Sequence, residues 1–152
     1  MKTLAEIFYD AITADETLTA LTGGRVVSTC FEVPPGGDDN TPVPNIIIVH
    51  GKFQNGNTTK DCVWEADEDM VEVTIDIAAN TDGEVVRLVA RVRKVINDYI
   101  TTMYTNGQAI PELQAGFPVG DDIAWDWMKP CYYQKLTYQC ITEKYEEDEQ
   151  EY

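Results

Sequence analysis

The sequence predicts an α+β domain in which a mostly antiparallel sheet of about five or six strands has two main helices packed on one face. Two segments, residues 3–14 and 81–99, carry apolar residues at helical spacing. Strand-like segments lie between and after them and follow one another through short connections. Such strands favour antiparallel pairing, and a helix with one apolar stripe buries that stripe against a sheet.

The first helix is predicted from Thr3 to Ala14. Thr3 followed by Glu6 is a capping box, in which each side chain binds the backbone N–H of the other residue. A short helical turn over residues 15–21 should end at Gly23-Gly24, where a left-handed cap is free of steric strain. The apolar stripe recurs at steps of three and four: Leu4, Ile7, Phe8, Ala11 and Ile12.

Three or four strands are predicted before the second helix. Arg25 to Val33 is rich in β-branched residues and stops at the Pro- and Gly-rich residues 34–40. Asn45 to Gly51 contains four consecutive apolar residues, which favour a central strand. A turn signal at residues 53–57 follows and opens a loop from Phe53 to Glu68. Met70 to Ala79 alternates apolar and polar residues, as a strand with one buried face does.

The second main helix is predicted from Thr81 to Tyr99. Thr81 and Glu84 have capping-box spacing, and four cations lie away from the apolar stripe: Arg87, Arg91, Arg93 and Lys94. Ala109 to Gly120 contains two prolines and reads as a loop or an irregular edge. The closing strands are expected at Ile123 to Trp127 and at Tyr132 to Glu143.

The length of 152 residues fits one domain, which we place at residues 1–145. Residues 146–152 form an acidic tail that should repel itself and stay disordered. A net charge of −16, from 11 Lys and Arg against 27 Asp and Glu, argues against sequence-specific nucleic-acid binding. No apolar run approaches the ~20 residues of a membrane helix. The four scattered cysteines are expected to be thiols in a reducing cytoplasm.

The sequence predicts no enzyme. Ser28 and His50 are the single serine and the single histidine, and both fall in predicted strands without a nucleophile elbow. The acidic residues 65–69 lack the glycine and the distant glutamate of a calcium loop, so a solvated rim is expected there. No metal-ligand spacing and no phosphate loop occurs. We therefore expect no catalytic residue, no metal and no cofactor.

Four aromatic residues are the predicted subunit or partner contacts. Phe53 and Trp64 fall in the loop from Phe53 to Glu68, where a solvated monomer would not place large apolar groups. Trp125 and Trp127 should share one strand face beside Asp126. Such a pair can stack on a sugar, but contacts in the core or between subunits are the commoner use of large aromatic residues.

The order of these elements resembles that of the bacteriophage tail-completion and tail-terminator proteins. In that family a helix is followed by a leucine, glycine, arginine and strand pattern, as in residues 15–26 here. Pro44 to Val49 is similar to its proline-led apolar strand, and Val71 to Ile77 to its alternating strand. Asp82 to Tyr99 looks like its second helix. The resemblance extends over residues 3–100, approximately.

The resemblance implies a non-enzymatic phage or prophage virion protein, either a tail terminator or a head–tail joining component. Proteins of this kind form a ring, commonly of six subunits, on the head-proximal end of the tail tube. The expected partners are other copies of the chain, the tail tube protein and a head-completion or connector protein. The expected locations are the virion and, during assembly, the host bacterial cytoplasm.

The residues themselves also allow a second function. An acidic binding module or inhibitor would act on a basic partner protein through the tail at Glu146 to Glu151 and the acidic segment at Glu65 to Asp69.

Overall fold

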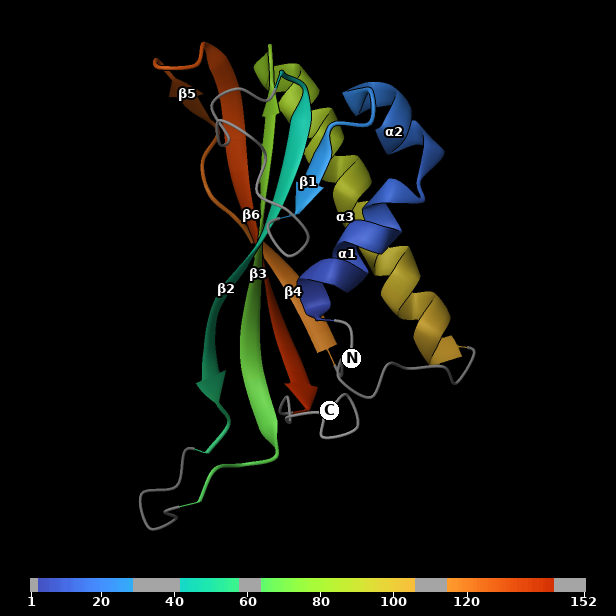
Figure 1. The fold of residues 1–152 in the computed structure, drawn as a ribbon, viewed down its shortest axis with the longest axis vertical. Helices are drawn as coiled ribbons and strands as arrows, with labels where there is room; N and C mark the ends of the chain where they lie inside the picture. The colour runs from blue at the N-terminus through green and yellow to red at the C-terminus, as the bar shows by residue number, and fades with distance from the viewer. Residues whose placement is uncertain (1–2, 29–41, 58–63, 106–114, 144–152) are drawn as a thin grey trace, which may run out of the picture.

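The computed structural model describes residues 3–28, 42–57, 64–105 and 115–143. Three helices and six strands make up this part of the chain (Figure 1). The helices are α1 (Leu4–Thr13), α2 (Glu16–Thr22) and α3 (Asp82–Thr105). The strands are β1 (Val26–Ser28), β2 (Asn45–Asn55), β3 (Glu68–Ala79), β4 (Ala115–Gly120), β5 (Ala124–Asp126) and β6 (Cys131–Glu143). The predicted α+β class is confirmed.

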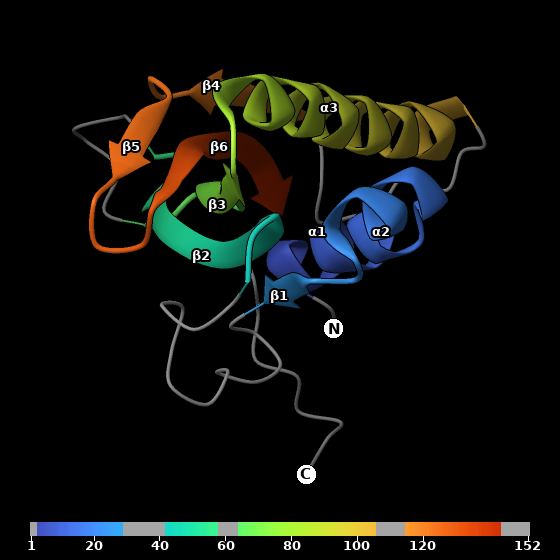
Figure 2. The same ribbon diagram turned by 90° about the horizontal axis from the view of Figure 1, so that it is seen from above.

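The strands form one sheet in the order β1-β2-β3-β6-β4, and β5 pairs with the first residues of β6. Only β1 and β2 run parallel, while the other pairs are antiparallel. Helix α1 packs on β1 and β2, and α3 packs on β3 and β6. Figure 2 shows all three helices on the same side of the curved sheet. The predicted arrangement of sheet and helices is therefore confirmed.

The core lies between the helices and one face of the sheet. Every second residue of β3 points into it, which is the alternation that the sequence predicts. Phe8 of α1 reaches across to β6, where its ring lies edge-on to Tyr138 at a centroid distance of 5.3 Å. The largest fully buried side chains are Phe8, Leu4, Ile12, Leu18, Ile46, Ile48, Ile75, Ile77, Ile96, Leu136, Val73 and Val85.

The helix ends follow the predicted caps. Glu6 N donates to the Thr3 hydroxyl at 3.4 Å, and Thr3 N donates to the Glu6 carboxylate at 3.0 Å. Glu84 N donates to the Thr81 hydroxyl at 3.2 Å at the start of α3. Gly23 ends α2 with φ of +63°, in the left-handed region. These local contacts fix where each helix begins or ends.

Three segments differ from the prediction. The predicted turn at residues 53–57 is wrong, because β2 continues to Asn55 and pairs with β3 over that length. Residues 115–120 form a regular strand at the edge of the described sheet, where Pro118 is tolerated. The first predicted strand is described only as far as Ser28, and the remainder of it lies outside the described residues, as does the acidic tail.

No helix in the described part of the chain combines the length and the apolar character that a membrane crossing requires. Cys131 and Cys140 are buried free thiols, while Cys30 and Cys62 lie outside the described residues. Burial raises the pKa of the Cys140 thiol to about 12. Burial also raises the pKa of Cys131, so neither thiol is activated as a nucleophile.

Candidate interaction site at the two ends of the sheet

A β-bulge re-aims the second half of β2. His50 pairs with Val73 and Phe53 pairs with Val71, so that two residues of β2 lie opposite Glu72 alone. One of the two is Gly51, where a Cβ atom would lie 2.9 Å from the Cβ of Glu72. In a regular strand, residues three apart point to opposite faces. The bulge places both His50 and Phe53 on the face that carries the helices.

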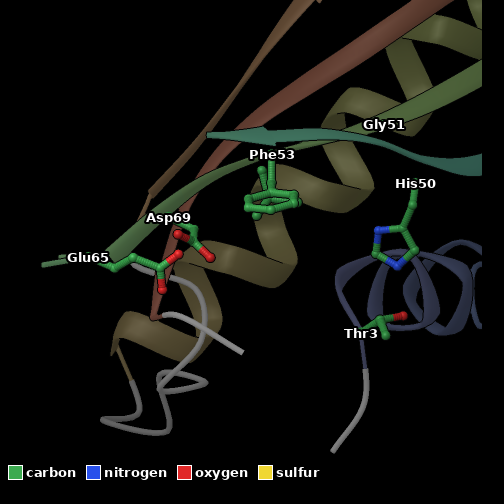
Figure 3. Close-up of a pocket in the computed structure, with 7 residues that line it drawn as sticks. Thr3, His50, Gly51, Phe53, Glu65 and Asp69 are labelled. Atoms are coloured by element: carbon green, nitrogen blue, oxygen red, sulfur yellow. The ribbon is translucent and has the colours of Figure 1, made fainter. Parts of the chain in front are cut away.

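A cavity of about 440 Å³ lies between this part of β2 and the start of α1. Figure 3 shows His50 pointing toward Thr3, while Phe53 lies on the side of the pocket nearer Asp69 and Glu65. The side chain of Phe53 is 69% exposed. We call this cavity the arm pocket; its lining residues are Thr3, His50, Gly51, Phe53, Glu65, Asp69 and Val71.

The side chain of His50, which forms one wall of the arm pocket, is neutral at pH 7. Burial lowers the pKa of His50 from 6.5, and the nearby Glu6 carboxylate offsets this only in part. The Nε2 atom of His50 is covered, and no group in the described residues hydrogen-bonds to it. An added proton on Nε2 would therefore have no acceptor. With Phe53 and Val71, the neutral imidazole gives the pocket a mainly apolar lining.

Asn55 ties the two strands together at the outer side of the arm pocket. Its Nδ2 donates to the Asp69 carboxylate at 2.9 Å and to the Ala66 carbonyl at 3.0 Å. Its Oδ1 accepts from the backbone N–H of Ala66 at 2.8 Å and of Asn57 at 3.1 Å. Asp69 is buried, so the expectation that residues 65–69 form a solvated rim is wrong at that residue. Trp64, just before this segment, is 78% exposed.

The opposite end of the sheet carries a second apolar group, in the turn between β5 and β6. We call residues 127–130 the β5–β6 turn. The Asp126 carboxylate accepts from the backbone N–H of Met128 at 2.9 Å and of Lys129 at 3.3 Å, which fixes the turn. The side chains of Trp127 and Met128 are 84% and 95% exposed.

The ring of Trp125 packs against an aromatic residue of this turn and another that follows it. Its ring lies edge-on to Tyr132 at 4.7 Å and to Trp127 at 5.8 Å between centroids. The prediction that Trp125 and Trp127 share a strand face is wrong, because β5 ends at Asp126 and Trp127 belongs to the turn. Trp125 is half-buried, and Trp127 alone of the two presents most of its ring to solvent.

The two ends are separated by the length of β6. Its first residue, Cys131, adjoins the β5–β6 turn, while its last residue, Glu143, pairs with Glu68 at the start of β3. Thirteen extended residues span about 43 Å. Figure 1 shows the two ends at opposite extremes of the long axis. The structure thus places Phe53 and Trp64 at one end and Trp125 and Trp127 at the other.

Sequence reasoning missed two features of these ends. Met128 is the most exposed of the large apolar residues described, and its position after Trp127 in a turn was the available signal. The sequence favours a structural role for His50 at the end of a strand over a catalytic or metal-binding one, and it does not predict that His50 forms a wall of the arm pocket. No spacing in the sequence signals the bulge that brings His50 and Phe53 to one face.

The described residues contain no group of three or more His, Cys, Asp or Glu side chains that could hold a metal. Ser28 is buried in β1, paired with Ile48, and is 3% exposed. A serine this deeply buried is not accessible as a nucleophile.

Comparison with known proteins finds a chain that has a similar fold. No family model and no curated protein matches the chain. A chain of the virion of a native gene transfer agent (GTA) particle matches it in structure, with a TM-score of 0.56 and 14% sequence identity. The two chains share a fold. The alignment covers 93% of this chain and 95% of the GTA virion chain, so the likeness extends over the whole domain.

Proposed function

We propose that the chain is a non-enzymatic phage or prophage virion protein that acts as a tail terminator or head–tail joining component. The observation that carries the proposal is the fold shared, over almost the full length of both chains, with a chain of the GTA virion, which is a phage-like particle. The order of sequence elements, which resembles the tail-completion and tail-terminator proteins, supports the same role independently.

The distribution of apolar side chains also supports a protein that works in an assembly. Both ends of the sheet present large apolar groups to solvent. On the sheet face opposite the helices, three further side chains are about half exposed: Met70, Phe117 and Val119. Where exposed apolar side chains gather into a patch, they mark contact sites. Subunits or partner proteins would cover them.

The proposed mechanism is geometric. Copies of the chain form a closed ring, possibly of six subunits, at the head-proximal end of the tail tube. One face of the ring covers the last layer of tube protein, so that no further tube subunit adds. The other face receives the head-completion or connector protein. Closure of a ring requires that one surface of each copy fits a different surface of the next.

Deleting the gene in the strain that carries it tests the proposal. Without a terminator or joining protein, tails should have irregular length or should fail to join heads, as seen by electron microscopy of lysates. Expression of the chain from a plasmid should restore normal particles. Normal particles in the deletion strain would overturn the proposal.

Imaging of the purified protein gives a second test. Rings of uniform size are the expected result, alone or on purified tail tubes. A protein that stays monomeric, does not bind tubes and binds a basic protein instead would favour the acidic inhibitor.

A further inference from the structure

We infer that neighbouring copies join head to tail, with Trp127 and Met128 of one copy entering the arm pocket of the next. This inference rests on the proposed self-assembly and specifies the surfaces that carry it. The occupant of the arm pocket is a second copy of this chain, presented through its β5–β6 turn.

Shape and polarity favour this occupant. The arm pocket has a volume of about 440 Å³ and a mainly apolar lining that includes Val71, Phe53 and the neutral ring of His50. Interface anchors that fill such pockets are typically large and aromatic. Trp127 and Met128 are the two most exposed large apolar side chains in the described part of the chain. They project together from one turn.

Charge is also complementary. The arm pocket carries two carboxylates, Glu65 at its exposed side and the buried Asp69. The β5–β6 turn brings Lys129, one of only 11 Lys and Arg residues in the chain, directly after Met128. In an acidic protein of net charge −16, few surfaces can approach a carboxylate-lined pocket without repulsion. The turn offers Lys129 as the opposite charge, beside the Asp126 carboxylate that binds the backbone of the turn.

A chain cannot fill its own pocket. The lining residues of the arm pocket on β2 and β3 lie at the register of Tyr138 to Thr142, seven or more residues along β6 from Cys131 and the β5–β6 turn, which is about 23 Å or more of extended strand. The two surfaces are also unlike, since one is a projecting turn and the other a cavity. When each pair of copies makes this contact once, the contact is heterologous, which is the kind of contact that closes rings.

Hydrogen bonds and ring contacts within each copy support both surfaces. The Asp126 carboxylate holds the backbone of the β5–β6 turn, and the ring of Trp125 supports Trp127. On the other side, Asn55 bridges β2 to the segment before β3. Preformed surfaces lose little conformational entropy on association, so that a small contact can hold two copies together.

The test uses the full chain with a change at each surface. The turn variant carries Trp127→Ala and Met128→Ala, and the pocket variant carries Phe53→Glu, which adds an anion beside Glu65. All three replaced side chains are mostly exposed, so folding should be unchanged. Leu21→Ala in α2 is the matched control, because Leu21 is an exposed apolar residue away from both surfaces.

Sedimentation velocity over a concentration series gives the readout. The wild type and Leu21→Ala should form the same oligomer. Each surface variant should need a concentration about thirty-fold higher, or more, to associate. An equimolar mixture of the two variants should form a two-chain species and nothing larger, because each mixed pair has one intact turn and one intact pocket. That mixture shows that the turn of one copy binds the pocket of another, and a wild-type oligomer larger than a dimer distinguishes the head-to-tail contact from a two-fold exchange.

A charge exchange provides a second pair of variants should Phe53→Glu fail to fold. Glu65→Lys and Lys129→Glu should each weaken association, and a mixture of the two should restore it, because the turn of each variant then meets a pocket of opposite charge in the other. Surface variants that assemble like the wild type would overturn this inference and leave the proposed function standing. A wild type that is monomeric at every concentration would also overturn it, while the gene-deletion phenotype would decide the proposed function separately.

Discussion

The guanidinium of Arg91 in α3 donates a hydrogen bond to each carboxylate oxygen of Asp15, with Nε 3.0 Å from Oδ2 and Nη2 2.7 Å from Oδ1. The same carboxylate accepts a hydrogen bond from the backbone N–H of Leu18 at 3.0 Å and so caps α2. One side chain therefore joins the start of α2 to the middle of α3. Planar paired contacts of this kind are the stronger class of ion pair.

Asp15→Ala should lower the free energy of unfolding by at least about 1 kcal/mol, because it removes the cap of α2 and leaves Arg91 without its acceptor. Chemical denaturation at pH 7 measures the change. Lys94→Ala is the control, since Lys94 pairs with Asp98 on an exposed face of α3. That substitution should change stability by less than about 0.5 kcal/mol. Equal effects of the two would contradict the assignment.

The contribution of Asp15 to the free energy of unfolding should disappear at low pH. The hydrogen bond from Arg91 is the main cause that holds the pKa of Asp15 below its ordinary 3.8. A carboxyl whose pKa is lower in the folded state stabilises the fold above the unfolded pKa. The stability difference between the wild type and Asp15→Asn should therefore be constant from pH 7 to pH 5 and shrink as the pH falls below 3.8. A difference that persists at low pH would rule out this ion pair as its source.

The single histidine should titrate below its ordinary pKa. Burial lowers the pKa of His50 from 6.5 in the folded protein. Because the unfolded chain then binds a proton more readily, His50 should reduce stability as the pH falls through 6.5. NMR of the one imidazole measures the pKa directly. Glu6→Gln should lower it further, since the Glu6 carboxylate raises it. A value of 6.5 or higher would contradict the expectation that burial outweighs the effect of the Glu6 carboxylate.

Gly51→Ala should destabilise the protein by about 1–3 kcal/mol, because the added Cβ would lie 2.9 Å from the Cβ of Glu72 and 3.2 Å from its carbonyl oxygen. Thermal or chemical unfolding measures the loss. Gly120→Ala is the control: its Cβ would meet only the Nε2 end of Gln134 at 3.3 Å, which can move aside. If Gly51→Ala were as stable as Gly120→Ala, the close approach at the bulge would be disproved.

Deleting residues 145–152 separates the two functions that the sequence left open. A ring protein whose contacts lie at the two ends of the sheet should assemble as before, as judged by its mass in solution. An acidic inhibitor should lose its basic partner. Loss of assembly in the truncated chain would assign the tail a role in self-association that the proposed contact does not include.

The parts of the fold that the sequence predicted correctly are those governed by local pattern. The alternation in β3 and the helical stripe over residues 82–99 each follow from a period that burial imposes. The caps at Thr3 and Gly23 depend on residues close in the chain. Such features need no information about distant strands.

The candidate site was predicted only in part, because it depends on pairing between segments. Phe53 was placed in a loop, whereas its pairing with Val71 keeps it in β2. The bulge arises where Gly51 meets Glu72, a residue 21 positions away. From the sequence, Asp69 is predicted to be a solvated acid. In the structure, the pairing of β2 with β3 brings Asn55 into hydrogen-bond contact with its carboxylate. Three of the four aromatic residues chosen from the sequence are exposed and Trp125 is half-buried, but the sequence does not show how they divide between two ends of the sheet.

The unlike ends of the molecule give any row of copies a direction. In the contact that we propose, an open row always retains one bare turn at its leading end and one vacant pocket at its trailing end. Each added copy again leaves one turn and one pocket unfilled at the two ends of the row, so growth does not end by itself. Only the return of the last turn to the first pocket satisfies every subunit at once. Subunit number is then set by the angle between successive copies, and a finished ring offers nothing onto which a further copy can add.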